Sequence, residues 1–134
     1  MSPIILIVDD APDWRAMLAG LIGDVLPQIQ VLTAASMEEA RRQLTQHPIR
    51  LAIIDIRLDE SDEDNIDGLT LAEFIRAHYP QTQALIITGY ANLETVKRAM
   101  QPDETGARLV ADYIQKENLH NELLPRLSAV LGEA

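Results

Sequence analysis

The chain has 134 residues, of which 47% are hydrophobic, and this composition is typical of one folded domain rather than a disordered segment. It contains no cysteine, which excludes disulfides, cysteine-based metal sites and thiol nucleophiles. The formal net charge of −10 disfavours direct binding to nucleic acid. The apolar run at the start is too short to cross a bilayer and lacks the features of a signal peptide. We therefore expect a single domain over residues 1–134 that is cytoplasmic and contacts neither membrane nor nucleic acid directly.

Strands are predicted where apolar residues follow one another without alternation, as in parallel strands that are covered on both faces. In chain order these runs are Ile4–Val8, the more mixed Ile29–Ala34, Leu51–Ile54, Ala84–Ile87 and the weaker Leu109–Ile114.

Helices are predicted in the segments that separate these strands. Pro12 suits the first turn of a helix whose apolar residues, from Trp14 to Val25, recur at helical spacing. Ser36 followed by Glu39 is the pattern of a capping box at the start of the next helix. Further helical patterns cover Gly68–His78, Asn92–Gln101 and the region around Leu123–Leu131.

The alternation of strands and helices predicts an α/β fold with a doubly wound, parallel, five-stranded sheet and helices on both faces. Ligands of such sheets bind beyond the carboxyl ends of the strands. The residues found at those ends are Asp9 and Asp10 after the first strand, Asp55 after the third, Thr88 after the fourth and Lys116 after the fifth. Three carboxylates, a hydroxyl and an ammonium group are thus predicted to converge on one rim.

Taken singly, most of these residues have ordinary structural explanations. Asp9 or Asp10 suits a helix cap, and Lys116 suits a solvated surface. Asp55 differs because it directly follows the apolar run 51–54, and a partly buried carboxylate there needs a paired charge or a metal ion. Oxygen ligands without His or Cys favour Mg²⁺. Such an ion neutralises phosphoryl oxygens during transfer to a carboxylate, so the residues predict a phosphoryl acceptor.

Four segments carry a resemblance to a known family: LIVDDAPDWR at the first strand, LAIIDIRL at the third, ALIITGY at the fourth and ADYIQK at the fifth. Over essentially its whole length the chain resembles the receiver domain family of two-component signalling. The resemblance implies a flavodoxin-like (βα)5 fold with strand order 2-1-3-4-5.

The resemblance also implies how a Mg²⁺ ion is held. Asp55 is the expected site of phosphorylation and a metal ligand. Asp10 is expected to bind the ion directly and Asp9 through water. The backbone carbonyl of Arg57 is expected to complete the protein ligands.

Further roles follow from the same resemblance. Thr88 and Lys116 are expected to hold the phosphoryl group. Tyr113 is the expected switch aromatic, which moves inward when Thr88 meets the phosphate. Arg57 and Tyr90, two residues beyond the acceptor and the threonine, are expected to flank the path of the attacking water and to slow loss of the phosphoryl group.

The implied function is that of a signalling switch rather than an enzyme, because the domain catalyses only its own phosphorylation and dephosphorylation. The expected donor is a histidine kinase or a phosphotransfer protein, and the expected target is a downstream protein. A phosphorylation-independent pseudo-receiver is one alternative, although such chains commonly lose the acceptor or the acidic pair. A small hydrolase similar to the haloacid dehalogenase family is another, but that family needs two aspartates spaced two residues apart after the first strand, whereas Asp9 and Asp10 are adjacent.

The sequence departs from the family pattern at four places. Lys116 is followed by Glu117 instead of proline, and we predict a trans bond there because a cis bond to a non-proline residue costs roughly 2.5–4 kcal/mol. The acidic segment 59–67 and the turn-forming segment Pro102–Gly106 are insertions. Pro125 is expected to kink or delay the last helix.

Overall fold

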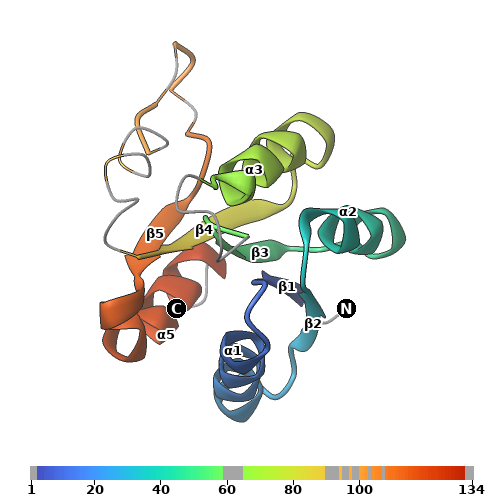
Figure 1. The fold of residues 1–134 in the computed structure, drawn as a ribbon, viewed down its shortest axis with the longest axis vertical. Helices are drawn as coiled ribbons and strands as arrows, with labels where there is room; N and C mark the ends of the chain where they lie inside the picture. The colour runs from blue at the N-terminus through green and yellow to red at the C-terminus, as the bar shows by residue number, and fades with distance from the viewer. Residues whose placement is uncertain are drawn as a thin grey trace.

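The fold is built on a parallel sheet of five strands in the order β2-β1-β3-β4-β5, as predicted (Figure 1). The structure is a computed structural model that describes residues 3–58, 65–89, 94, 97, 100–102, 104–106 and 108–131. The strands are β1 (Ile4–Val8), β2 (Gln30–Ala34), β3 (Leu51–Asp55), β4 (Gln83–Thr88) and β5 (Asp112–Gln115).

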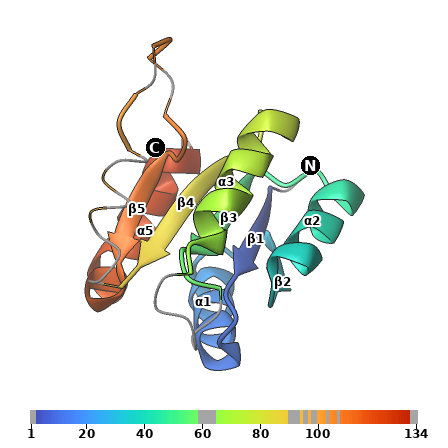
Figure 2. The same ribbon diagram turned by 45° about the horizontal axis from the view of Figure 1, so that its top comes forward.

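Helices cover both faces of this sheet. The described helices are α1 (Pro12–Val25), α2 (Met37–Gln46), α3 (Asp67–His78), the short 3₁₀ helix η2 (Lys116–Asn118) and α5 (Leu119–Leu131). Helices α1 and α5 lie on one face, and α2 and α3 on the other (Figures 1 and 2). The helix predicted over Asn92–Gln101 falls mainly outside the described residues, as do residues 59–64 of the acidic insertion. No helix within the described ranges is both long and apolar enough to span a bilayer.

Two apolar cores separate along the sheet because successive side chains of a strand point to opposite faces. In β1, Ile5 and Ile7 pack in the core under α1 and α5, whereas Leu6 and Val8 pack in the core under α2 and α3. All five residues of β1 and of β3 are buried. The continuous apolar runs of β1 and β3 therefore reflect burial of these two interior strands on both faces.

The start of α2 confirms the Ser36 half of the predicted capping box, while Glu39 reaches back to the residue before the cap. The Oγ of Ser36 accepts a hydrogen bond from the backbone N–H of Glu39 at 3.2 Å. The carboxylate of Glu39 in turn accepts one from the N–H of Ala35 at 3.0 Å. The two bonds satisfy donors that have no partner within the helix.

The last strand and the last helix differ from the sequence prediction. The apolar run from Leu109 was expected to start the fifth strand, but β5 begins at Asp112; Val110 is buried because it packs in the core, not because it pairs in the sheet. Pro125 does not delay α5, which already begins at Leu119 and continues through the proline. Pro125 and Asn121, whose carbonyl loses its N–H partner to the proline, are both exposed residues.

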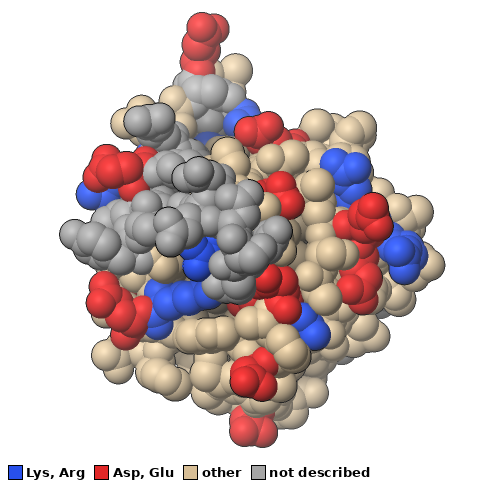
Figure 3. Space-filling view, viewed as in Figure 1, with Lys and Arg blue, Asp and Glu red and all other residues tan. Residues whose placement is uncertain are grey.

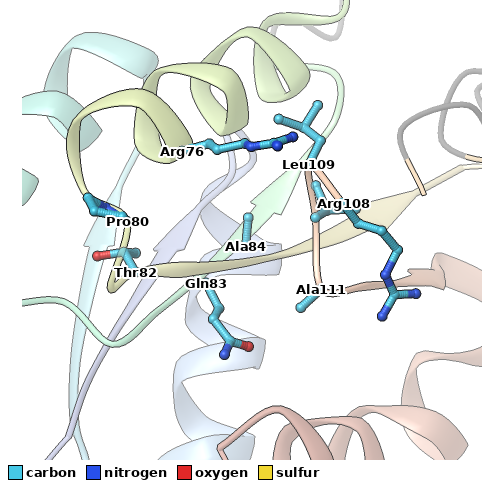
Figure 4. Close-up of a pocket in the computed structure, with 9 residues that line it drawn as sticks. Arg76, Pro80, Thr82, Gln83, Ala84, Arg108, Leu109 and Ala111 are labelled. Atoms are coloured by element: carbon cyan, nitrogen blue, oxygen red, sulfur yellow. The ribbon is translucent and has the colours of Figure 1, made fainter. Parts of the chain in front are cut away.

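A cavity of about 510 Å³ lies at the amino end of β4, far from the edge where the strands end. Figure 4 shows Arg76 of α3 reaching along it toward Leu109, with Gln83 and Ala84 of β4 opposite. Because ligands of doubly wound sheets bind at the carboxyl edge, this cavity lies at the wrong end for the predicted chemistry.

Gly68, in the first turn of α3, lies against the backbone that follows β3. A Cβ atom at this position would come within 2.2 Å of the Asp55 carbonyl oxygen and 2.6 Å of the Ile56 Cα. The N–H of Gly68 donates to the Ile56 carbonyl at 2.9 Å. The glycine thus allows α3 to approach the segment that carries Asp55.

We predict that Gly68→Ala lowers the free energy of unfolding by roughly 1–3 kcal/mol or more, because backbone must move to admit the methyl group. Gly20→Ala is the matched control, since no atom other than the neighbouring backbone of α1 lies within 4 Å of a Cβ at this position. The control should be neutral or stabilising by about 0.5–1 kcal/mol. Urea unfolding of both variants measures the difference, and equal effects would contradict the close approach of α3.

Candidate functional site

The predicted site residues meet at the carboxyl edge of the sheet because of its register. Val8 pairs with Ile54, so Asp9 follows β1 beside Asp55 at the end of β3. Asp55 itself pairs with Ile87, one residue before Thr88. Lys116 follows Gln115, the partner of Thr88 in β5. Four strands far apart in sequence therefore deliver these side chains to one rim.

Asp55 and Lys116 form an ion pair at the centre of this rim. The Lys116 Nζ lies 3.0 Å from Asp55 Oδ2. The Asp55 side chain is 3% exposed and the Lys116 side chain 22% exposed. The backbone N–H of Arg57 donates to the other Asp55 oxygen, Oδ1, at 3.2 Å. A buried carboxylate with these two donors is held in one orientation, as a nucleophile requires.

Asp9, Asp10 and Asp55 form an acidic cluster. One carboxylate oxygen from each lies within 4.8 Å of those of the other two. Asp9 and Asp55 are buried, and Asp10 is partly buried. Carboxylates at this separation repel one another, and a hard divalent cation relieves that repulsion through the oxygen ligands it prefers.

Burial raises the pKa of the Asp9 carboxyl from 3.8 to about 6, with smaller contributions from the charges of Asp55 and Asp10 in the same direction. The backbone N–H of Ala11, which donates to Asp9 Oδ1 at 2.9 Å, and the Lys116 ammonium both oppose this rise. The Asp9 carboxylate is therefore less stable in the folded chain than in water.

Thr88 is fully buried at the end of β4. Its hydroxyl donates to the backbone carbonyl of the adjacent Gly89 at 2.9 Å. The hydroxyl must leave this carbonyl before it can donate to a group bound at Asp55.

Comparisons with known proteins identify the family of the chain. A family model of the response regulator receiver domain matches residues 5–128. The chain belongs to the response regulator receiver domain family. The resemblance read from the four sequence motifs is thereby confirmed.

Individual relatives point to the same family. The chain is 31% identical to the response regulator protein PilR of Pseudomonas aeruginosa over 96% of this chain and 30% of that protein. It is 31% identical to the nitrogen assimilation regulatory protein NtrX of Azorhizobium caulinodans, over 87% of this chain and 23% of that protein. The crystal structure of the NtrX receiver domain from Brucella abortus superposes with a TM-score of 0.80 at 28% identity, over 97% of this chain and 99% of that one. This receiver domain thus spans less than a third of the length of the two curated relatives.

The remaining predicted residues of this receiver domain have mixed outcomes. The Lys116–Glu117 bond is trans, as predicted, since the described residues contain no cis peptide. Tyr113 is half-buried and packs against the core under α2 and α3. Tyr90 lies outside the described residues.

Two residues of α1 support the site of the receiver domain and were not singled out from the sequence. Arg15 donates from Nη1 to the backbone carbonyl of Asp9 at 2.8 Å, which ties the end of β1 to the helix. Trp14 lies beside Lys116, whose Nζ is 5.1 Å from the ring centroid. Both residues lie within the segment LIVDDAPDWR, but helical spacing assigned Trp14 only to the core.

Asn65 supports the chain that follows β3 and was also not predicted as a site residue from the sequence. Its Oδ1 accepts the backbone N–H groups of Leu58 and Asp67, both at 3.0 Å. The motif NID before Gly68 is a local signal for such a turn, because Asn side chains readily accept nearby backbone N–H groups.

We predict that Asp9→Asn raises the free energy of unfolding by roughly 1–3 kcal/mol at pH 7 without divalent cations. The pKa of Asp9 in the folded chain, about 6, exceeds its ordinary value of 3.8. Below about pH 3.8 the Asp9 carboxyl is protonated in both the folded and the unfolded chain, and its contribution to the free energy of unfolding is fully present. That contribution is lost as the pH rises through about 6, where the folded chain must ionise the buried carboxyl. The gain over the parent should shrink as the pH falls from 7 toward 4, as measured by urea unfolding. A gain that is constant over this pH range would contradict the strained carboxylate.

Proposed function

We propose that this receiver domain is a phosphoryl-accepting switch in which Asp55 takes a phosphoryl group from a histidine kinase or phosphotransfer protein with Mg²⁺ bound. The observation that carries the proposal is the Lys116–Asp55 ion pair, 3.0 Å long, beside two further carboxylates. A lone buried aspartate that pairs with lysine suits a structural role, but the adjoining Asp9 and Asp10 have no place in a purely structural ion pair.

The donor set fits Mg²⁺. The carboxylates of Asp10 and Asp55 and the backbone carbonyl of Arg57 would hold the ion directly, and Asp9 would act through water. These are hard oxygen donors, and Mg²⁺ usually keeps several of its waters. When bound, the ion neutralises charge on phosphoryl oxygens during transfer.

Transfer of the phosphoryl group from a phosphohistidine to Asp55 exchanges one bond to phosphorus for another. An Asp55 carboxylate oxygen forms the new bond to phosphorus while the bond from phosphorus to the imidazole nitrogen breaks, and the electron pair stays on the imidazole. The Lys116 ammonium, which is paired with the Asp55 carboxylate before transfer, donates to a phosphoryl oxygen after it. Thr88 exchanges its bond to the Gly89 carbonyl for one to another phosphoryl oxygen.

The change of hydrogen-bond partner at Thr88 would couple phosphorylation of Asp55 to a change in the surface of the domain. Movement of this residue would open space for Tyr113 to turn inward, and the altered surface would meet a downstream protein. The domain would act in the cytoplasm and catalyse only its own phosphorylation and dephosphorylation. Among the described residues visible in Figure 3, acidic and basic side chains are interspersed, so both signs are available for contact with partner proteins.

The alternatives have weaker support. A pseudo-receiver does not require an acidic pair beside the acceptor, yet the carboxylates are kept together despite the raised pKa of Asp9. A hydrolase similar to the haloacid dehalogenase family would need its aspartates on alternate positions after β1, but they are adjacent.

We predict that acetyl phosphate labels the parent protein only when Mg²⁺ is present, and that Asp55→Asn abolishes the label because the nucleophile is lost. Asp24→Asn, which removes an exposed carboxylate at the far end of α1, is the control and should be labelled normally. Intact-mass spectrometry detects the added phosphoryl group. Equal labelling of Asp55→Asn and the parent would rule out the proposed acceptor.

We also predict that the phosphorylated state decays slowly because Arg57 and Tyr90 hinder in-line attack by water. Removing a shield that contributes about 1.4 kcal/mol would speed decay about tenfold. Decay of the labelled protein with Mg²⁺ is compared among the parent, Arg57→Asn and Tyr90→Ala. Unchanged decay in both variants would show that neither side chain protects the phosphoryl group.

A further inference from the structure

Trp14 contacts the one basic group of the proposed chemistry from a different element of the fold. It lies in the first turn of α1, whereas Lys116 follows β5. The Lys116 Nζ lies 5.1 Å from the centroid of the Trp14 ring and 3.0 Å from Asp55 Oδ2. The ammonium group therefore has an aromatic ring and a carboxylate as simultaneous neighbours.

This distance is within the range of a cation–π interaction, for which the ammonium lies within about 6 Å of the ring centroid. Tryptophan offers the strongest aromatic face for such a contact. With the Lys116 side chain only 22% exposed, water screens the contact less than at an open surface.

Lys116 needs such a restraint because its ammonium lies at the end of a flexible side chain and can point in many directions. The next residue is Glu117, which does not fix its backbone φ as a proline would. The three residues Lys116–Asn118 form only a short 3₁₀ turn, and none of them is buried.

We propose that Trp14 is a positioning residue that holds the Lys116 ammonium at the acceptor, and that it thereby sets the rate of phosphorylation. This inference rests on the proposed function of Asp55. As the negative charge at Asp55 grows on phosphorylation, the ring keeps the ammonium close to the new phosphoryl oxygens. In this role Trp14 acts through Lys116.

A simpler role for Trp14 is core packing, since it is half-buried against the apolar core under α1 and α5. Core packing alone predicts that its loss lowers stability and leaves the chemistry of Lys116 unchanged. The two roles therefore differ in how the effect of Trp14 depends on Lys116.

The test is a double-mutant cycle of labelling rates with acetyl phosphate and Mg²⁺. We expect Trp14→Leu to slow labelling roughly three- to thirtyfold, from the strength of a partly buried cation–π contact. Trp14→Phe, with a weaker aromatic face, should lie between Trp14→Leu and the parent. In the Lys116→Gln background, Trp14→Leu should change the residual rate less than about twofold, because the residue through which it acts is gone. Leu21→Ala, which loses packing in the same core two turns along α1, should label like the parent.

A second readout uses the fluorescence of Trp14, which is the only tryptophan of the chain. Lys116→Gln should change its emission, whereas Lys97→Gln should not. This measurement remains decisive if Trp14→Leu fails to fold, and identical emission from the parent and Lys116→Gln would overturn the inference.

The outcomes separate the two proposals. If the parent is labelled but Trp14→Leu is labelled at the same rate, or is slowed equally in both backgrounds, Trp14 is not a positioning residue and the acceptor role of Asp55 stands. If the parent takes no label with Mg²⁺, the proposed function fails and this inference fails with it.

Discussion

The rest of the structure depends on a cluster of charges at the carboxyl edge of the sheet. Three carboxylate groups lie within 4.8 Å of one another there, and the Lys116 ammonium lies 3.0 Å from that of Asp55. Burial and, to a lesser extent, the charges of Asp55 and Asp10 raise the pKa of Asp9 to about 6, while Lys116 forms an ion pair with Asp55. The folded chain thus keeps charges together at a cost in stability. Proteins keep charges together at such a cost where function requires it. A bound cation would offset the negative charge of the carboxylates and of the phosphoryl oxygens.

The two cores make this arrangement possible. Burial of both faces of β1 and β3 fixes the ends of these strands, so Asp9 and Asp55 cannot separate without disrupting the core. The close approach of α3 at Gly68 and the bonds from Asn65 hold the chain after β3. On the other face, Arg15 ties the end of β1 to α1. Stability elsewhere in the molecule therefore offsets the strain at the rim.

The sequence predicted most of the fold because burial on both faces leaves continuous apolar runs, which mark Ile4–Val8 and Leu51–Ile54 clearly. The same signal failed at Leu109, since an apolar residue can be buried in a core without pairing in a sheet. Pro125 was expected to disturb its helix, but α5 continues through it, and both Pro125 and Asn121, whose carbonyl loses its N–H partner, are exposed residues.

Within the site, the sequence predicted the residues that end strands, because parallel topology alone brings Asp55 and Lys116 together. It did not predict the contacts made by Trp14 and Asn65. A tryptophan at helical spacing is compatible with simple core packing, and only the fold places its ring 5.1 Å from Lys116 Nζ. The Asn65 side chain accepts the N–H groups of both Leu58 and Asp67, and the bond to Leu58 joins residues seven positions apart, which local sequence does not specify.

The most direct test of this account is the dependence of stability on Mg²⁺. The free energy of unfolding is measured at pH 7 over increasing MgCl₂, with NaCl added to hold the ionic strength constant. If the carboxylates form a cation site, stability of the parent rises by about 1.4 kcal/mol for each tenfold increase in Mg²⁺ above the dissociation constant, and Asp10→Asn loses most of this rise. Stability that does not change with Mg²⁺, or that rises equally in Asp10→Asn, would contradict the account.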